Sequence, residues 1–225
     1  MNDKHLPHFV VLEAIQHTHD RCFLCVLEDK VLRDNFETML YESVNDGILR
    51  ARLLHSRGYC PRHARILLEC RKIFGTAILY LDQLRIFREE VAKSRPGARI
   101  RPPRDSALVN PADHCPACLL QAESRERYIQ AFIKGLGEKD IPAAFEAAGQ
   151  ICTPHFYPLL NAIKNKTHRA WLKQLVEEKY QNIENHLAEY RRKMDYRNED
   201  EAISPDEEKA PRMAVELMTG LPGIF

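Results

Sequence analysis

The sequence predicts an all-α fold, built as a tandem duplication of one helical unit. Apolar residues recur at three- and four-residue steps along most of the chain, and no strand-like alternation of useful length occurs. A pattern of cysteine and histidine residues appears twice in nearly the same register, and matching apolar positions lie between its members. With 225 residues, the chain has room for one large domain or two small ones. We therefore expect two similar helical repeats related by a pseudo-twofold axis.

The first repeat is expected to hold three helical segments. Residues 25–44 carry helical periodicity without Pro or Gly. The next helix has Asp46 as a plausible N-cap and stops at Gly58, a residue type that often follows a helix end. From residue 61 a long helical run reaches about residue 94, with a break expected at Gly75.

The second repeat follows a segment that cannot sustain a helix. Residues 94–105 hold four arginines, three prolines and a glycine, and so predict an extended linker. Beyond it we expect a helix from about 116 to 136, a short one over 141–148, one that begins at Pro154, and a long one over 168–194.

The C-terminal part of the chain predicts one more helix. Ser204-Pro205-Asp206-Glu207 is a capping box with Pro at the first helical position, and the helix should reach about Thr219. Just before it, Asp195-Tyr196-Arg197-Asn198 is expected to clasp the end of the preceding helix; the alternative is that it lines a binding cleft. The predicted organisation is a first repeat (1–94), a basic Pro-rich linker (95–111), a second repeat (112–197) and an acidic tail with a C-terminal helix (198–225).

Each repeat carries a Cys-x-x-Cys motif and a Cys-x-x-His motif. A separation of three residues lets a tight turn or a first helical turn aim two side chains at one point, and structural zinc takes four Cys and His ligands from two such pairs. Because four protein ligands fill the coordination sphere, a hydrolytic zinc is not expected. We predict two structural Cys₃His sites that hold two Zn²⁺ ions per chain, from Cys22, Cys25, Cys60 and His63 in the first repeat and Cys115, Cys118, Cys152 and His155 in the second.

Two alternatives for these sites stay open. Three cysteines and one histidine can also hold an iron–sulfur cluster. Because the repeats are alike, Cys22 and Cys25 could also share a metal with Cys152 and His155. We expect ligation within each repeat, since the helices between its two motifs fit a hairpin that returns to its start.

The remaining composition narrows the function without assigning one. The net charge of +1 gives no general attraction to nucleic acid or to a membrane surface. The N-terminus does not resemble a signal peptide, so we expect a cytoplasmic protein with reduced thiols. Phosphate-binding loops, nucleophile elbows and HExxH motifs are absent from the sequence, and we assign no catalytic or organic-cofactor residue.

The leading hypothesis is a binding, scaffold or regulatory module with a protein or small-molecule partner, which could form a homodimer through the C-terminal helix. The rival hypothesis is an enzyme whose active site lies in a groove between the repeats and uses His17, His19 or Arg197.

The two metal motifs and the later "MDYRNED" stretch together resemble an uncharacterised prokaryotic family, a domain of unknown function. That family shows a duplicated Cys-Pro-x-Cys and Gly-x-Cys-x-x-His pattern before an Asp-Tyr-Arg-Asn stretch. The second copy fits with Cys115-Pro116-Ala117-Cys118, whereas the first has Phe23 in place of the proline. The resemblance covers roughly residues 20–220. It implies a cytoplasmic protein from bacteria or archaea, and it implies no particular activity.

Overall fold

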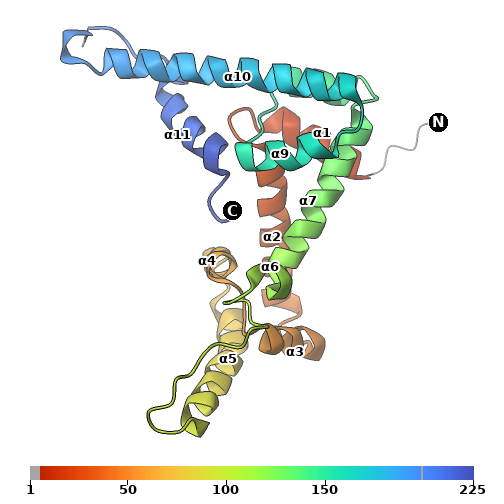
Figure 1. Ribbon diagram of the computed structural model, residues 1–225, viewed down its shortest axis with the longest axis vertical. Helices are drawn as coiled ribbons and strands as arrows, with labels where there is room; N and C mark the ends of the chain where they lie inside the picture. The colour runs from red at the N-terminus through yellow and green to blue at the C-terminus, as the bar shows by residue number, and fades with distance from the viewer. Residues whose placement is uncertain (1–5, 199) are drawn as a thin grey trace. The chain divides into compact units, whose positions relative to one another are not determined.

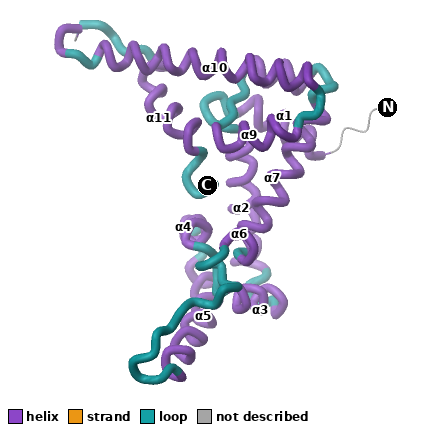
Figure 2. Tube along the Cα trace, in the orientation of Figure 1, coloured by secondary structure: helices purple, strands orange, loops and turns teal. Residues whose placement is uncertain are grey.

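The computed structural model describes residues 6–198 and 200–225. Within these ranges the regular structure is helical throughout, and no strand is present, which confirms the all-α prediction (Figures 1 and 2). An isolated β-bridge joins Cys22 and Gln150. No helix in the described ranges combines the length and apolarity needed to cross a membrane. The internal duplication and its pseudo-twofold axis stay predictions.

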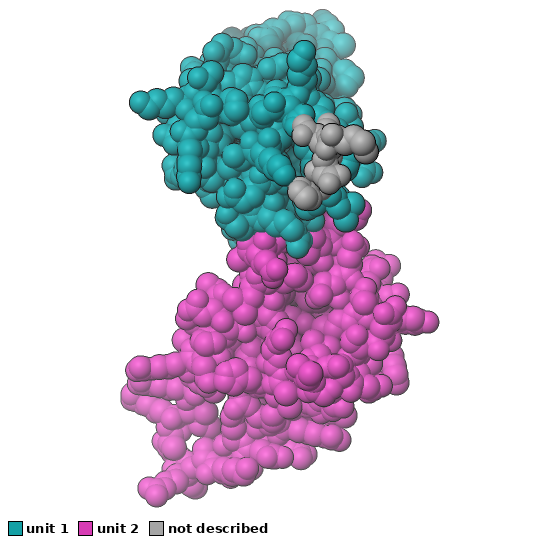
Figure 3. All heavy atoms as spheres, turned by 90° about the vertical axis from the view of Figure 1, so that its right-hand side faces the viewer, with its two compact units in different colours: residues 1–27, 125–225 teal, residues 28–124 magenta. Residues whose placement is uncertain are grey.

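The chain divides into two compact units (Figure 3). Unit 1 combines residues 1–27 with 125–225, and unit 2 holds residues 28–124. The boundaries fall inside two long helices, α2 (Phe23–Glu42) and α7 (Pro116–Gly135). Each unit therefore draws segments from both of the expected sequence repeats.

Unit 1 is built around an aromatic cluster. The rings of Phe23, Phe132 and Phe145 lie 5.3–5.9 Å apart, and all three side chains are fully buried. Such pairs add about 0.5–1.5 kcal/mol beyond the area they bury. Its remaining helices are α1 (Leu6–His17), α8 (Asp140–Ala147), α9 (Thr153–Ala162), α10 (Lys166–Lys193), the 3₁₀ turn η1 (Tyr196–Asn198) and α11 (Pro205–Thr219), which packs on α10 and α9.

Unit 2 packs its helices around a second aromatic contact. The rings of Phe36 and Tyr59 meet edge to face at 5.0 Å, and the Tyr59 hydroxyl donates to Met39 Sδ. The Pro-rich segment after residue 94 is irregular, as expected, but the Ala107 amide donates to the Ser56 carbonyl at 2.7 Å. Besides the parts of α2 and α7, the unit holds α3 (Gly47–Ser56), α4 (Pro61–Glu69), α5 (Ile73–Lys93) and α6 (Pro111–His114).

Several local predictions are confirmed. The Asp46 carboxylate caps α3 by accepting from the Leu49 amide, and Gly58 follows that helix with a φ of 91°. The capping box of α11 forms around Ser204. The helix-end clasp also forms, because Arg197 pairs with Asp195 at 2.6 Å and the Asn198 amide donates to the Arg192 carbonyl.

Two features differ from the predictions. The break expected at Gly75 is wrong: α4 ends at Glu69, Arg71 adopts a positive φ of 54°, and α5 runs through Gly75. This glycine instead permits close packing, since a Cβ there would lie 2.3 Å from the Leu40 carbonyl oxygen. Helix α1 was not foreseen, although its buried residues recur at helical spacing.

Candidate metal centres

The eight predicted ligands gather into two clusters, each with three cysteines and one histidine. The ligand atoms of each cluster all lie within 4.8 Å of one another. The prediction that each cluster forms within one repeat is wrong, since both combine the Cys-x-x-Cys of one repeat with the Cys-x-x-His of the other. Site A consists of Cys22, Cys25, Cys152 and His155, and site B consists of Cys60, His63, Cys115 and Cys118.

Each site lies entirely within one compact unit, site A in unit 1 and site B in unit 2. In both sites the first residue of each motif directly precedes a helix and the second lies in its first turn. Cys22 precedes α2, Cys60 precedes α4, Cys115 precedes α7 and Cys152 precedes α9. Unpaired amides at a helix start favour negative charge, so the four helix starts favour thiolates.

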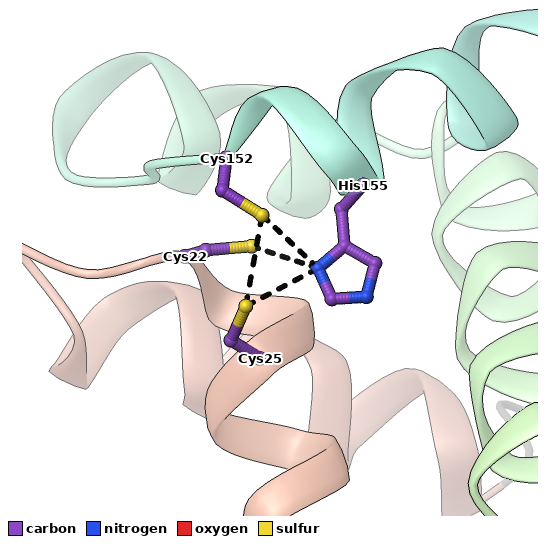
Figure 4. Close-up of side chains that lie close together, drawn as sticks. All are labelled: Cys22, Cys25, Cys152 and His155. Atoms are coloured by element: carbon purple, nitrogen blue, oxygen red, sulfur yellow. Dashed lines mark hydrogen bonds between the residues drawn. The ribbon is translucent and has the colours of Figure 1, made fainter. Parts of the chain in front are cut away.

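The geometry of site A fits a single tetrahedral ion. The four side chains point toward one centre (Figure 4). His155 Nδ1 lies 3.3–3.4 Å from the three sulfurs, and the Cys25 and Cys152 sulfurs are 3.6 Å apart. With Zn–S near 2.3 Å and Zn–N near 2.0–2.1 Å, a regular tetrahedron has S–N edges of about 3.6 Å and S–S edges of about 3.8 Å. The sulfurs are also too far apart for a disulfide, which needs about 2.05 Å.

Site B has the same dimensions. His63 Nδ1 lies 3.3–3.6 Å from the three sulfurs, and the Cys60 and Cys118 sulfurs are 3.8 Å apart. The Cys60 amide donates to Cys115 Sγ at 3.4 Å. A thiolate that accepts an amide hydrogen bond is stabilised in its charged form, as a metal ligand must be.

Site B is supported by a relay of buried polar side chains. His63 Nε2 donates to Gln121 Oε1 at 3.1 Å, which leaves Nδ1 unprotonated toward the sulfurs. Gln121 Nε2 in turn donates to Glu28 Oε2 at 2.6 Å, and Arg62 donates to both Gln121 Oε1 and Cys118 Sγ. Gln121 and Glu28 are almost completely buried. This relay orients the imidazole and places a positive charge beside the thiolates.

The relay was not foreseen from the sequence, although a signal was present. Glu28 and Gln121 each stand three residues after the second cysteine of a Cys-x-x-Cys motif. On a helix that begins at the motif, this spacing puts each side chain on the same face as the cysteine.

The C-terminal segment of the chain covers site A. The Phe225 ring meets the His155 ring at 4.8 Å, and the Arg125 guanidinium lies over Phe225 at 4.9 Å. The Tyr180 hydroxyl holds this region in place by donating to the carbonyls of Ile151 and Leu217 at 3.0 and 3.2 Å. These contacts help to keep all four site A ligands buried.

Contacts among the ligand side chains shift the pKa values of the thiols in both clusters. Burial opposes ionisation of the Cys22 thiol, but hydrogen bonds from Cys152 and Cys25 outweigh it and hold its pKa well below the ordinary value. The hydrogen bond with Cys152 raises the pKa of Cys25. In site B, the hydrogen bond from Cys115 lowers the pKa of Cys60. A divalent cation in place of the shared protons would allow all the thiols to ionise.

The other residues singled out from the sequence do not join these sites. Exposed His17 donates from Nδ1 to the Glu13 carbonyl, and exposed Arg197 serves in the helix-end clasp. His19 lines a separate cavity in unit 1. Cys70, the seventh cysteine, is half-buried at the end of α4 and donates to the Ile66 carbonyl.

The fold and the two clusters define a helical protein with two closed Cys₃His centres. Residues 3–222 match the model of a family described as "Family of unknown function (DUF6062)", and the chain belongs to that family. The chain is also similar to an uncharacterized 23.9 kDa protein encoded in the xynA 3′ region of Caldicellulosiruptor sp. (strain Rt8B.4). The two are 32% identical over 202 residues, which cover 89% of this chain and 96% of that protein. No solved structure gives a significant match.

Proposed function

We propose that the protein binds two structural Zn²⁺ ions, one at site A and one at site B, and that it acts as a binding or scaffold module. The observation that carries this proposal is the pair of Cys₃His sets with edges of 3.3–3.8 Å. Four protein ligands complete a tetrahedron and leave no position for a reacting water, as is typical of structural zinc. A bound Zn²⁺ would supply folding free energy to both units.

The same distances favour one ion over an iron–sulfur cluster. A cluster places several irons and bridging sulfides between its ligands, whereas each set here has all its ligand atoms within 4.8 Å of one another. Three thiolates and a neutral imidazole also suit Zn²⁺ in charge and softness.

Metal analysis of the purified protein, together with its absorbance spectrum, tests the assignment. We expect two zinc ions per chain and no visible absorbance. Absorbance near 400 nm together with stoichiometric iron and sulfide would contradict the zinc assignment and support an iron–sulfur cluster. Chelation should abolish helical circular dichroism in proportion to the metal removed, and unchanged helicity after verified removal would refute a structural role.

The proposed scaffold role implies a binding partner and a location in the cell. We propose a protein or small-molecule partner in the cytoplasm of a prokaryote, where reduced thiols remain available for zinc. The C-terminal helix α11 offers one surface for such a partner, because Val215 and Met218 are 63% and 57% exposed although Leu217 is buried.

A second candidate function rests on a cavity of 470 Å³ in unit 1. Ionisable side chains converge there, among them His19, His186 and Lys179, and burial lowers the pKa of Lys179. Gln150 also lines the cavity, and its buried Oε1 has no hydrogen-bond partner among the described residues. These groups favour a site for a small polar ligand or substrate that donates a hydrogen bond.

Thermal denaturation against a panel of polar metabolites tests this candidate. A compound that raises the Tm of the wild type but not of Lys179→Met would support it. If no compound raises the Tm of the wild type, the scaffold role stands alone.

A further inference from the structure

Helix α5 carries an exposed row of mostly apolar side chains with coiled-coil spacing. The row alternates steps of three and four residues, which is the a/d pattern of a heptad repeat. Its members are exposed, with Phe74 at 79%, Leu84 at 65% and Leu81 at 48%. We call this row the α5 seam, and it consists of Phe74, Ala77, Leu81, Leu84, Arg88 and Val91.

The seam lies on the side of α5 away from helix α3, while Leu84 and Val91 at its edge also border the Pro-rich segment. The opposite side of α5 makes the intramolecular contacts: Leu79 is buried, the Asp82 carboxylate pairs with Arg50, and Gln83 donates to the Leu53 carbonyl. These three residues lie on one side of the helix, about 180° from the seam at 100° per residue. A contiguous apolar row of this kind on a folded domain marks an interaction site.

We propose that two copies of the chain pair through the α5 seam as an antiparallel coiled coil. The seam is complementary to itself when one helix is reversed. Phe74 then faces Val91 of the second copy, Ala77 faces Arg88, and Leu81 faces Leu84, with the same three layers repeated beyond the twofold axis. Two of the layers therefore pair a larger side chain with a smaller one, and the third pairs two leucines. Such combinations allow close packing in the seam.

Charge selects the antiparallel orientation. In a parallel pair, Arg88 would face Arg88 of the second copy in one desolvated layer, and Phe74 would face Phe74. In the antiparallel pair the long Arg88 stem lies over the small Ala77, and its guanidinium can reach solvent at the edge. A polar residue at a core position specifies the register of a coiled coil in a comparable way.

The surface beside the seam extends the contact. Leu84 and Val91 also line a mainly apolar groove of 510 Å³ between α5 and the Pro-rich segment, with Phe87 and Ile100. Figure 2 shows this segment as the loop that runs back along α5. A 21-residue helix is only about 31 Å long, so contacts in the groove add area to a short coiled coil.

Sedimentation equilibrium of the metal-loaded full chain over a range of concentrations tests the proposal. The wild type should be a concentration-dependent dimer, and Leu84→Arg should weaken dimerisation by about tenfold or more because it buries a second cation in the seam. Tyr41→Arg is the matched control, since Tyr41 is 80% exposed on α2 and lies outside the seam. Circular dichroism establishes that each variant folds. A monomeric wild type, or equal dimerisation by the Leu84→Arg and Tyr41→Arg variants, would overturn the proposal.

Two further variants test the location and the orientation. Val215→Arg should leave the dimer intact. If Val215→Arg instead abolishes dimerisation and Leu84→Arg does not, the interface lies on α11 and not on α5. Ala77→Glu should tighten an antiparallel dimer, because the new carboxylate faces Arg88, and Ala77→Glu with Arg88→Leu should lose that gain. In a parallel dimer Ala77→Glu would place two carboxylates in one layer, so weaker dimerisation would refute the antiparallel arrangement.

Discussion

Gln121→Leu should weaken metal binding at site B and leave site A unchanged. The substitution keeps a side chain of similar size but removes the hydrogen bonds from His63 Nε2 and from Arg62, both at 3.1 Å, and the one to Glu28 at 2.6 Å. Without the acceptor, the His63 tautomer and ring orientation are no longer fixed. Loss of such a partner typically costs 10–100-fold in metal affinity, or about 1.4–2.7 kcal/mol.

Competition with a chromophoric chelator measures this effect. Because site A lies in the other compact unit, we expect two phases in the variant, with one metal equivalent released at a lower chelator concentration and the other as in the wild type. Gln130→Leu is the control, since Gln130 is exposed on the same helix and bonds only to the surface residue Glu126 in the described contacts. Equal retention of both metals by Gln121→Leu would refute the role of the relay.

Two further predictions concern stability. Gly75→Ala should destabilise the protein by about 1–2 kcal/mol in urea unfolding, because the clash with the Leu40 carbonyl outweighs the gain in helix propensity. Gly47→Ala is the control and should be neutral or stabilising, because the space around Gly47 is open. Glu207→Gln should destabilise the protein at pH 7, because a hydrogen bond with Lys193 lowers the pKa of Glu207 from its ordinary 4.5. The ionised carboxylate therefore stabilises the fold at pH values above 4.5. The difference in urea midpoint between wild type and Glu207→Gln should vanish as the pH falls well below 4.5. A difference that stays constant with pH would contradict the stabilising ion pair.

Local sequence patterns were sufficient to predict most of the structure near each motif. Helical periodicity and the absence of alternation predicted the all-α fold, and caps such as Asp46 and Ser204 lie where predicted. These features depend on contacts within a few residues, so the sequence specifies them directly. The break misplaced at Gly75 shows the limit of such rules, because that glycine responds to a distant carbonyl rather than to its own helix.

The pairing of the metal motifs depends on helix lengths, which the sequence did indicate, rather than on the motifs themselves. Helix α2 has 20 residues and ends 17 residues after Cys25, so it carries the chain about 26 Å from that cysteine, whereas α3 has 10 residues and can bring it back only about 15 Å. In the second repeat, α7 with 20 residues is followed by α8 with 8, about 12 Å. In each case the second helix of the hairpin is too short to return the Cys-x-x-His motif to the Cys-x-x-Cys motif of the same repeat.

The combination of motifs from the two predicted repeats changes what a bound metal would stabilise. A metal held within one repeat would close a short hairpin, but site A joins Cys25 to Cys152 and site B joins His63 to Cys115. Closing a longer loop removes more entropy from the unfolded chain, although the cost grows only slowly with length. Site B lies within the sequence span that site A encloses, so metal at B shortens the free chain that metal at A must close. Folding of unit 2 around site B would therefore lower the entropy cost of closing site A, so the two sites favour folding cooperatively although each one lies entirely within its own unit.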